Sequence, residues 1–343
     1  MTGEVLLPCA ELGPTLSFFV GELDFAIEAI FPADEPRVAS LAGHGLRLRL
    51  EPVAGDPGVL RLPGPAGTVR VAPNGTRIEF VDPDPPAMIP PLAPAFVLNR
   101  AAEGPGPGEG RAGMLYRDLI PGRLGGRFIA SHISIPEGGP VADWVHFHKV
   151  RFQMIFCRRG WVRLVYEDQG EPFVLAAGDC VLQPPRIRHR VLESSPGLEV
   201  VELGCPALHE TLADHDMALP TGRLDAGRVF EGQRFLRHGA AETPWTPDAR
   251  AGFERRETGM AAATGGLADA RALRPATARG FAAVARPDGE LMFGFVLEGS
   301  ATLRCAGDHA LGPADAFVIP PGAGWGLADA SDALALLEVV LPA

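Results

Sequence analysis

The sequence predicts a mainly β protein that contains an internal duplication and begins with a small α+β module. The chain has 42 glycines and 34 prolines among 343 residues, which favours many turns and short strands over long helices. From residue 114 onward, short apolar runs recur at a spacing of about 8–12 residues, which is typical of a β sandwich or barrel. The last part of the chain then repeats the pattern of this region.

The first module spans residues 1–81 and predicts the element order βαβββ. A strand is expected over 5–12, and a helix over 12–23 follows from Leu12, Leu16, Phe19 and Leu23 at helical spacing. Further strands are expected over 26–32, 37–43, 46–52 and 76–82, each an alternating run bounded by Pro, Gly or Asp.

This module resembles a single glyoxalase/bleomycin-resistance (vicinal oxygen chelate) module, whose last strand often carries the pattern found at Gly75–Phe80. The resemblance implies that Glu79 could serve as a metal ligand if the first strand supplied a second one. That strand offers only Leu6, Leu7 and Cys9, which are poor ligands. We therefore expect a docking or dimerisation unit.

The remaining chain divides by composition into four segments. Residues 82–113 form a Pro/Gly-rich linker, which we expect to lie over a neighbouring domain because its apolar residues 96–98 need cover. Residues 114–220 form a first all-β domain, 221–250 a connector, and 251–343 a second all-β domain. Residues 297–304 and 312–325 of the second domain repeat the patterns at 157–164 and 177–189 of the first.

The most informative motif is a pair of histidines, His146 and His148. Because residues i and i+2 of a strand point to the same face, both imidazoles can converge on one ion inside a barrel. Gln153 follows five residues later, and His189 follows a Pro-Pro turn on a later strand.

With its spacing, this motif resembles the cupin family. The first cupin motif is matched by His146-x-His148-x4-Gln153-x6-Gly160, and the second by Gly178-x5-Pro184-x4-His189. Together with the duplication, the resemblance implies a bicupin, two jelly-roll barrels, over about residues 115–343. It also implies that His146, His148, Gln153 and His189 hold a divalent transition metal. Gln153 departs from the pattern, because it replaces the usual acidic ligand by a neutral carbonyl oxygen.

We expect Fe(II) at this site, because the resemblance to cupin dioxygenases favours it; Mn(II), Ni(II), Zn(II) and Cu(II) remain alternatives. Four further residues near the motifs are candidates for catalysis. Arg151 or Arg188 would bind a substrate carboxylate or enolate, and Tyr166 or Gln183 would hydrogen-bond a ligand or a metal-bound histidine.

In the second barrel the same positions carry no good metal ligands. Counting from Gly299 places Ala285, Pro287 and Met292 at the positions of the first three ligands, and Trp325 follows the second Pro-Pro turn. We expect a metal-free barrel there that serves as partner and stabiliser of the first, with a small apolar ligand pocket as the alternative. A further cluster of ligand-type side chains, residues 209–216, is either a second metal site or a polar connection between the barrels.

The formal net charge of −11 argues against nucleic acid or an anionic membrane surface as partner. Five scattered cysteines without a CxxC pair are typical of a reduced chain, and no apolar run is long enough to span a membrane. We expect a cytoplasmic, homodimeric protein with a small-molecule substrate.

The leading functional hypothesis is an oxidoreductase of the cupin dioxygenase type that acts on a small enolisable, phenolic or carboxylate-bearing metabolite. The alternatives are a Lewis-acid lyase or isomerase, and a non-enzymatic barrel that binds a metal and a metabolite.

Overall fold

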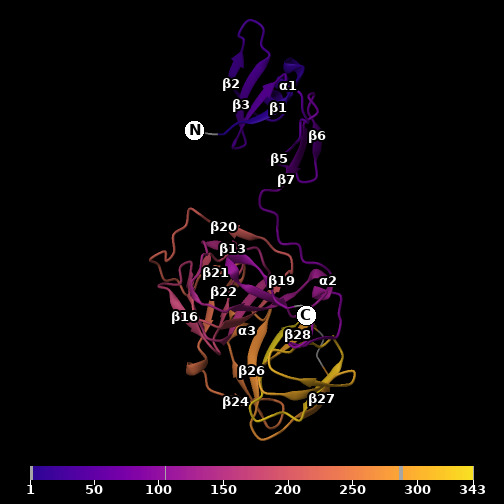
Figure 1. The fold of residues 1–343 in the computed structure, drawn as a ribbon, viewed down its shortest axis with the longest axis vertical. Coiled ribbons are helices and arrows are strands. Elements are labelled where there is room, and N and C mark those ends of the chain that lie inside the picture. The colour runs from indigo at the N-terminus through magenta and orange to yellow at the C-terminus, as the bar shows by residue number, and fades with distance from the viewer. Residues whose placement is uncertain (1–2, 105, 286–288, 343) are drawn as a thin grey trace. The chain divides into compact units, whose positions relative to one another are not determined.

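The computed structural model describes residues 3–104, 106–285 and 289–342 (Figure 1). By their contacts, the residues form two compact units, 1–86 and 87–343. The five cysteines are all buried and free.

The first unit contains one helix and two small sheets. The helix α1 (Leu12–Gly21) buries Leu12, Thr15 and Phe19. The four-stranded sheet has the order β1-β4-β3-β2 and consists of β1 (Val5–Pro8), β4 (Leu46–Glu51), β3 (Val38–Gly43) and β2 (Ala26–Phe31). The second sheet consists of β5 (Val59–Pro63), β7 (Arg77–Val81) and β6 (Val69–Val71).

The strand expected at 76–82 therefore lies in a separate sheet, beside two strands that the sequence analysis did not identify. Its Glu79 accepts hydrogen bonds from Arg61 and Arg77, whose guanidinium groups hold the pKa of this carboxyl below its ordinary value. Glu79 thus serves a surface ion pair. The resemblance to a vicinal oxygen chelate module stays a prediction.

The first barrel combines a seven-stranded and a six-stranded sheet. The larger sheet runs in the order β23 (Leu236–His238), β17 (Cys180–Leu182), β14 (Phe152–Arg159), β19 (Leu198–Cys205), β11 (Ile129–Ile135), β10 (Leu115–Asp118) and β9 (Gly108–Glu109). The other runs in the order β16 (Phe173–Ala176), β15 (Trp161–Tyr166), β18 (His189–Ser194), β13 (His146–His148) and β20 (Thr211–Ala213), and its sixth strand β12 (Gly139–Pro140) pairs with β18. Short helical turns lie at η1 (Arg111–Gly113) and α2 (Arg123–Gly126).

The second barrel repeats this design. Its seven-stranded sheet runs in the order β24 (Thr246–Pro247), β25 (Phe253–Glu257), β26 (Asp269–Pro275), β33 (Ala335–Pro342), β28 (Gly289–Glu298), β31 (Ala316–Val318) and β8 (Val97–Asn99). Its four-stranded sheet consists of β27 (Phe281–Ala285), β32 (Gly324–Ala328), β29 (Ala301–Arg304) and β30 (Asp308–Leu311). The connection between the barrels contains β21 (Val229–Phe230), β22 (Gln233–Arg234) and η2 (Ala240–Glu242), and α3 (Met260–Ala263) precedes β26.

The two barrels exchange edge strands. β8 lies in the predicted linker but pairs with β31 of the second barrel, and β23 lies in the predicted connector but pairs with β17 of the first. The apolar residues Phe96 and Leu98 pack against the interior of the second barrel, as the need for cover predicts. Each barrel thus completes its sheet with chain that precedes the other, which ties the two together.

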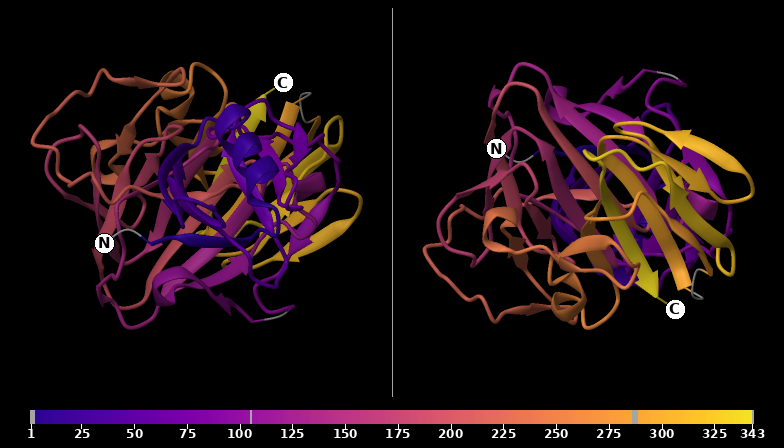
Figure 2. Two further views of the ribbon diagram at one scale, coloured as in Figure 1. Left: turned by 90° about the horizontal axis from the view of Figure 1, so that it is seen from above. Right: turned by 90° about the horizontal axis from the view of Figure 1, so that it is seen from below.

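The seven-stranded sheets pack face to face, and their side chains alternate between the interface and the barrel interiors. Met154 and Phe156 of β14 and Phe293 and Phe295 of β28 belong to the large apolar cluster between the barrels. The intervening residues of these strands point into the barrels. Figure 2 shows the strands of the second barrel, orange to yellow, beside the magenta strands of the first.

Candidate metal centre

Three histidines meet inside the first barrel. β13 pairs with β18 so that His146 lies directly opposite His189, with ring centroids 4.2 Å apart. His148 lies on the same face of β13, two residues on. One ring nitrogen of each lies within 4.8 Å of the other two, and all three side chains are buried. The predicted convergence of these imidazoles is confirmed.

Backbone carbonyls fix the orientation of each ring. The Nδ1 atoms of His146, His148 and His189 lie 2.8, 3.1 and 3.0 Å from the carbonyl oxygens of Trp144, Glu210 and Ile187, respectively. Because a carbonyl can only accept, each Nδ1 carries the proton and donates it. Each Nε2 therefore keeps a lone pair, which is the tautomer that a metal ion requires.

Burial keeps the three imidazoles neutral. It lowers the pKa of His148 to about 3, with a further contribution from the neighbouring His209 and His146. Burial also lowers the pKa of His189 well below its ordinary value, and that of His146 in the same direction. A metal ion would not compete with protons for these ligands at neutral pH.

The fourth predicted ligand, Gln153, points into the same barrel from β14. Its Nε2 donates a hydrogen bond of 2.5 Å to Oε1 of Glu202 on β19. Because the amide nitrogen is used in this way, the carbonyl oxygen of Gln153 is the atom left for a metal. Glu202 brings a carboxylate to the barrel that the sequence analysis did not anticipate.

Tyr166 and Gln183 form a buried pair next to His189. The Tyr166 hydroxyl donates to Oε1 of Gln183 at 2.6 Å, and Nε2 of Gln183 lies 3.5 Å from Nε2 of His189. Burial, together with the charge of Glu202, raises the pKa of the Tyr166 phenol far above its ordinary value, so this hydroxyl stays protonated. Gln183 thus lies within reach of a ring nitrogen of His189, and a catalytic role for either residue stays a prediction.

Arg111 also reaches the centre. Its Nη2 donates to Nε2 of His146 at 3.2 Å, its Nη1 pairs with the fully buried carboxylate of Asp143, and its guanidinium lies over the ring of Trp144. Asp143 also accepts a hydrogen bond from the backbone of Val191. A metal at the histidines would take the lone pair that Arg111 contacts, while Asp143 would still anchor the guanidinium.

The two arginines predicted to bind substrate are engaged elsewhere. Arg151 pairs with Glu290 of the second barrel at 2.7 Å. Arg188 pairs with Asp214 at 3.1 Å and lies over the ring of Phe147, which points away from the histidines because it alternates with them on β13. Arg111, which was not predicted, is a cation that contacts one of the three imidazoles.

The polar cluster at 209–216 supports the first barrel. Thr211–Ala213 forms β20, which pairs with β13, and the Glu210 carbonyl orients His148. The His209 ring lies 5.2 Å from that of His148, with Nδ1 near the Pro206 carbonyl. Among the described residues, only the three histidines of the centre form a group of three or more metal-binding side chains.

The sequence analysis missed Arg111, Asp143 and Glu202. Glu202 could have been found, because it follows Leu198 and Val200 on the inward-facing positions of an apolar strand. Arg111 carries no such signal, since it lies in the segment interpreted as a linker.

The second barrel lacks these ligands at the matching positions. Met292 and Trp325 are buried in its interior, and strand pairing places Val284, one residue before the position found by counting, opposite Trp325. Val284 is therefore the counterpart of His146. Pro287 lies outside the described residues.

No protein-family model matches this chain, and no curated protein is similar to it in sequence. Solved structures are similar in fold. A salicylate 1,2-dioxygenase from Pseudaminobacter salicylatoxidans has a TM-score of 0.51 at 17% identity, over 66% of this chain and 75% of that one. A mutant of Bacillus subtilis oxalate decarboxylase has a TM-score of 0.53 at 11% identity, over 75% and 78%. Protein Ylba from E. coli has a TM-score of 0.51 at 10% identity, over 74% and 93%.

These similarities and the strand order establish the fold of residues 87–343 as a bicupin with two jelly-roll barrels. The three neutral imidazoles of the first barrel fit a divalent transition metal, because imidazole nitrogens are typical donors for such ions. Gln153 as a fourth ligand stays a prediction. No helix in the described ranges is long and apolar enough to cross a membrane.

Proposed function

We propose that the first barrel is the active site of a metal-dependent oxidoreductase of the dioxygenase type. The observation that carries this proposal is the convergence of three buried imidazoles whose Nδ1 atoms donate to backbone carbonyls, so that each Nε2 keeps a lone pair for an ion. Fe(II) is the favoured ion, and Mn(II), Ni(II), Zn(II) and Cu(II) are alternatives. When bound, such an ion supplies Lewis acidity and, if it is iron, the redox chemistry that dioxygen requires.

The substrate class follows from the charged groups around the histidines. Arg111 lies beside His146 and is anchored by Asp143, so it can bind a substrate carboxylate in a fixed orientation. Glu202 is the carboxylate that can accept the proton of a phenol or enol as that oxygen becomes anionic. A small phenolic or enolisable carboxylic acid meets both requirements.

The solved structures add support from similar folds. One similar chain is a salicylate 1,2-dioxygenase determined in complex with gentisate, which has a TM-score of 0.52 at 15% identity. Salicylate and gentisate are both hydroxylated aromatic carboxylates. A dioxygenation of this kind inserts both atoms of O₂ into the product and therefore needs no external reductant.

Oxygen consumption tests the proposal. The Fe(II)-loaded protein is supplied with phenolic acids, 1,3-diketones and hydroxy acids in an oxygen electrode. We expect uptake with at least one phenolic or enolisable acid, and none with the His146→Ala, His148→Ala double variant. The exposed His215→Ala variant is the matched control and should keep the activity. No uptake with any compound would contradict the dioxygenase proposal.

A second candidate is a Lewis-acid lyase or isomerase. The ligands proposed for the metal are neutral, so no protein carboxylate reduces the positive charge of the ion, and this favours Lewis-acid catalysis. The similar oxalate decarboxylase has Mn(II) centres. Turnover of the same panel without oxygen, with Mn(II) in place of iron, would distinguish this reaction from the first.

A further inference from the structure

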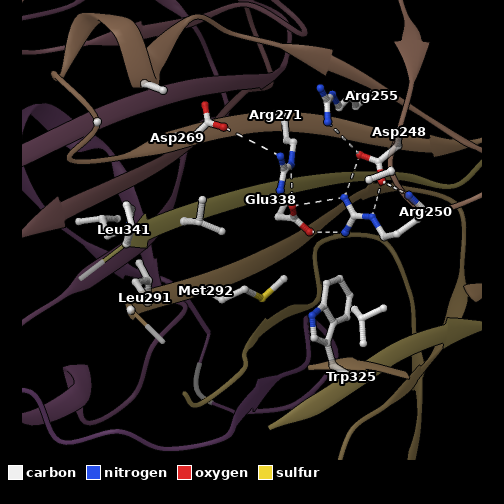
Figure 3. Close-up of a pocket in the computed structure, with 17 residues that line it drawn as sticks. Asp248, Arg250, Arg255, Asp269, Arg271, Leu291, Met292, Trp325, Glu338 and Leu341 are labelled. Carbon is white, nitrogen blue, oxygen red and sulfur yellow. Dashed lines mark hydrogen bonds and ion pairs between the residues drawn. The ribbon is translucent and has the colours of Figure 1, made fainter. Parts of the chain in front are cut away.

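A well-formed cavity lies in the second barrel, away from the three histidines. Its volume is about 550 Å³, which is within the range of small-molecule binding sites. Its lining comes from the loop residues 248–250, from α3 and the turn after it, and from β25, β26, β27, β28, β32 and β33 (Figure 3).

This cavity is the counterpart of the metal centre. Val284 and Trp325 form a cross-strand pair that matches His146 and His189, and both line the cavity. Met292 also lines it, at the position that matches Gln153. Val284 is 41% exposed, whereas His146 is buried, so the cavity is more open to solvent at this position than the metal centre. The duplicated fold thus keeps a cavity here but gives it other side chains.

One wall of the cavity is apolar. Met292, Leu291, Leu341 and the indole of Trp325 face it, as Figure 3 shows. Met292 and Trp325 belong to the interior of the second barrel, whereas Leu291 and Leu341 belong to the apolar cluster between the barrels. All four are buried, so packing sets their positions. Such a wall, with an aromatic face, suits the apolar body of a small aromatic or branched compound.

The opposite wall carries charges, and its most buried members pair with one another. Arg250 donates to both carboxylates, Asp248 at 2.6 Å and Glu338 at 2.7 Å. Those carboxylates are only 2% exposed, and Arg250 uses all three of its guanidinium nitrogens on them. Arg250, Asp248 and Glu338 together carry one net negative charge, which Arg271 balances through its pair with Glu338. This inner network fixes the wall, and Arg250 has no donor left for a ligand.

Two further arginines retain donors. Arg271 directs Nε and Nη2 at the same oxygen of Glu338, and its Nη1 comes no closer than 4.0 Å to Asp269. Arg255 pairs through Nε with Glu257, and its Nη1 lies 4.0 Å from Asp248. The guanidinium ends that line the cavity thus have hydrogen-bond donors without a close acceptor among the described residues.

We propose that the second barrel binds a small organic carboxylate with an apolar, aromatic body, at a site that needs no metal. The carboxylate accepts hydrogen bonds from Arg271 and Arg255, and the ring lies between Trp325 and Met292. This proposal does not depend on the activity of the first barrel. Because the proposed substrate of that barrel shares the same chemistry, the ligand is either the substrate itself or a separate effector acid.

Calorimetric titration of the His146→Ala, His148→Ala double variant with benzoate and 2-naphthoate tests the site with the first barrel disabled. We expect saturable binding with one site per chain, and at least tenfold weaker binding of the neutral isostere benzamide. Arg271→Gln in this background should weaken benzoate binding at least tenfold. Arg274→Gln removes the same charge from the same strand outside the cavity, where Arg274 pairs with Glu254, and should change nothing.

Arg271→Gln also removes a partner of Glu338, so a loss of binding could reflect a disturbed cavity wall. A second variant therefore changes no charge. Val340→Phe fills part of the cavity and should abolish naphthoate binding, whereas Val174→Phe, at an exposed position of the first barrel, should not. Thermal unfolding establishes that each variant is folded. The absence of binding to the double variant, or equal binding by Val340→Phe and its control, would overturn the proposal.

A last titration distinguishes the two possible ligands, the substrate of the first barrel and a separate effector acid. The unaltered protein is titrated with the acid that the first barrel is found to consume. Two sites per chain identify the substrate as the ligand of both barrels. One site identifies a separate effector acid. A failure of the dioxygenase assay leaves the titration of the double variant unaffected, so the two proposals fail independently.

Discussion

The two barrels present different chemistry at the same strand positions. At three matching positions the first barrel has His146, Gln153 and His189, whereas the second has Val284, Met292 and Trp325. The backbone pairing is shared, since the first and third position lie opposite each other in both barrels. The two barrels therefore share the backbone arrangement, and the side chains at a few positions decide whether the site suits a cation or an apolar ligand.

The barrels also share one acidic position and use it differently. Glu202 lies opposite Ser131 of β11, and Glu338 lies opposite Arg271 of the matching strand β26. Glu202 accepts from the neutral amide of Gln153, so its charge acts on the centre. Glu338 binds two guanidinium groups, so its charge is spent on structure.

Removal of the Glu338 carboxylate should have the largest effect on stability. Glu338→Ala leaves Arg250 and Arg271 largely buried without this partner, and loss of one member of a buried ion pair costs about 3–5 kcal/mol. Urea unfolding measures the loss. Glu254→Ala, which breaks a pair between exposed Arg274 and Glu254, is the control and should cost less than about 1 kcal/mol. Equal losses would show that the buried network is not special.

Metal removal should destabilise the first barrel alone. A metal present at 100 times its dissociation constant stabilises the folded state by about 2.7 kcal/mol, because it binds only the assembled ligands. Addition of a chelator should therefore lower the urea midpoint of the unaltered protein. The urea midpoint of the His146→Ala, His148→Ala variant should not change when chelator is added. Elemental analysis should find about one equivalent of metal in the unaltered protein and only background in this variant. A response of both proteins to chelator would contradict the assigned ligands.

Gln153→Glu should destabilise the first barrel in the absence of a metal, because it places two carboxylates next to each other. The new carboxylate would lie against Glu202, which now accepts a hydrogen bond of 2.5 Å from Gln153. We expect the metal-free protein to lose about 2 kcal/mol, since a hydrogen bond is replaced by repulsion between like charges. Urea unfolding with and without Mn(II) measures this loss, and the metal should reduce it.

The exchange variant Gln153→Glu, Glu202→Gln is the control, because it restores one amide and one carboxylate. It should recover most of the stability without metal. If it is as unstable as the single variant, the contact between residues 153 and 202 does not matter.

The smallest expected effect is a change in the pH dependence of stability under acidic conditions. Burial raises the pKa of Asp248, but the hydrogen bonds from Arg250 outweigh this and hold it below the ordinary value of 3.8. As the pH falls, Asp248 is protonated in the unfolded chain before it is protonated in the folded protein. Its contribution to the free energy of unfolding is therefore complete above the ordinary pKa and is lost as the pH falls through the lower pKa of the folded protein. The slope of stability against pH should be shallower in Asp248→Asn, by at most about 1.4 kcal/mol per pH unit. Urea midpoints between about pH 5 and 3 measure it, and an unchanged slope would contradict this account.

Much of the fold could be predicted because its signals are local. Short alternating runs, turn residues and the repeat at 312–325 indicated two β barrels, and a spacing of two residues on a strand placed His146 and His148 on one face. The exchange of β8 and β23 was less accessible, because an edge strand of three residues in a Pro-rich segment has too little pattern of its own.

The sequence by itself determined which residue types the first barrel offers to a metal, because spacing along a strand decides which side chains share a face. Only the tertiary structure decided what surrounds them. Arg111 reaches His146 from 35 positions away, and Glu202 reaches Gln153 from 49. Such meetings depend on which strands become neighbours and in what register, and those choices follow from the burial of the whole apolar interior, which no local pattern records.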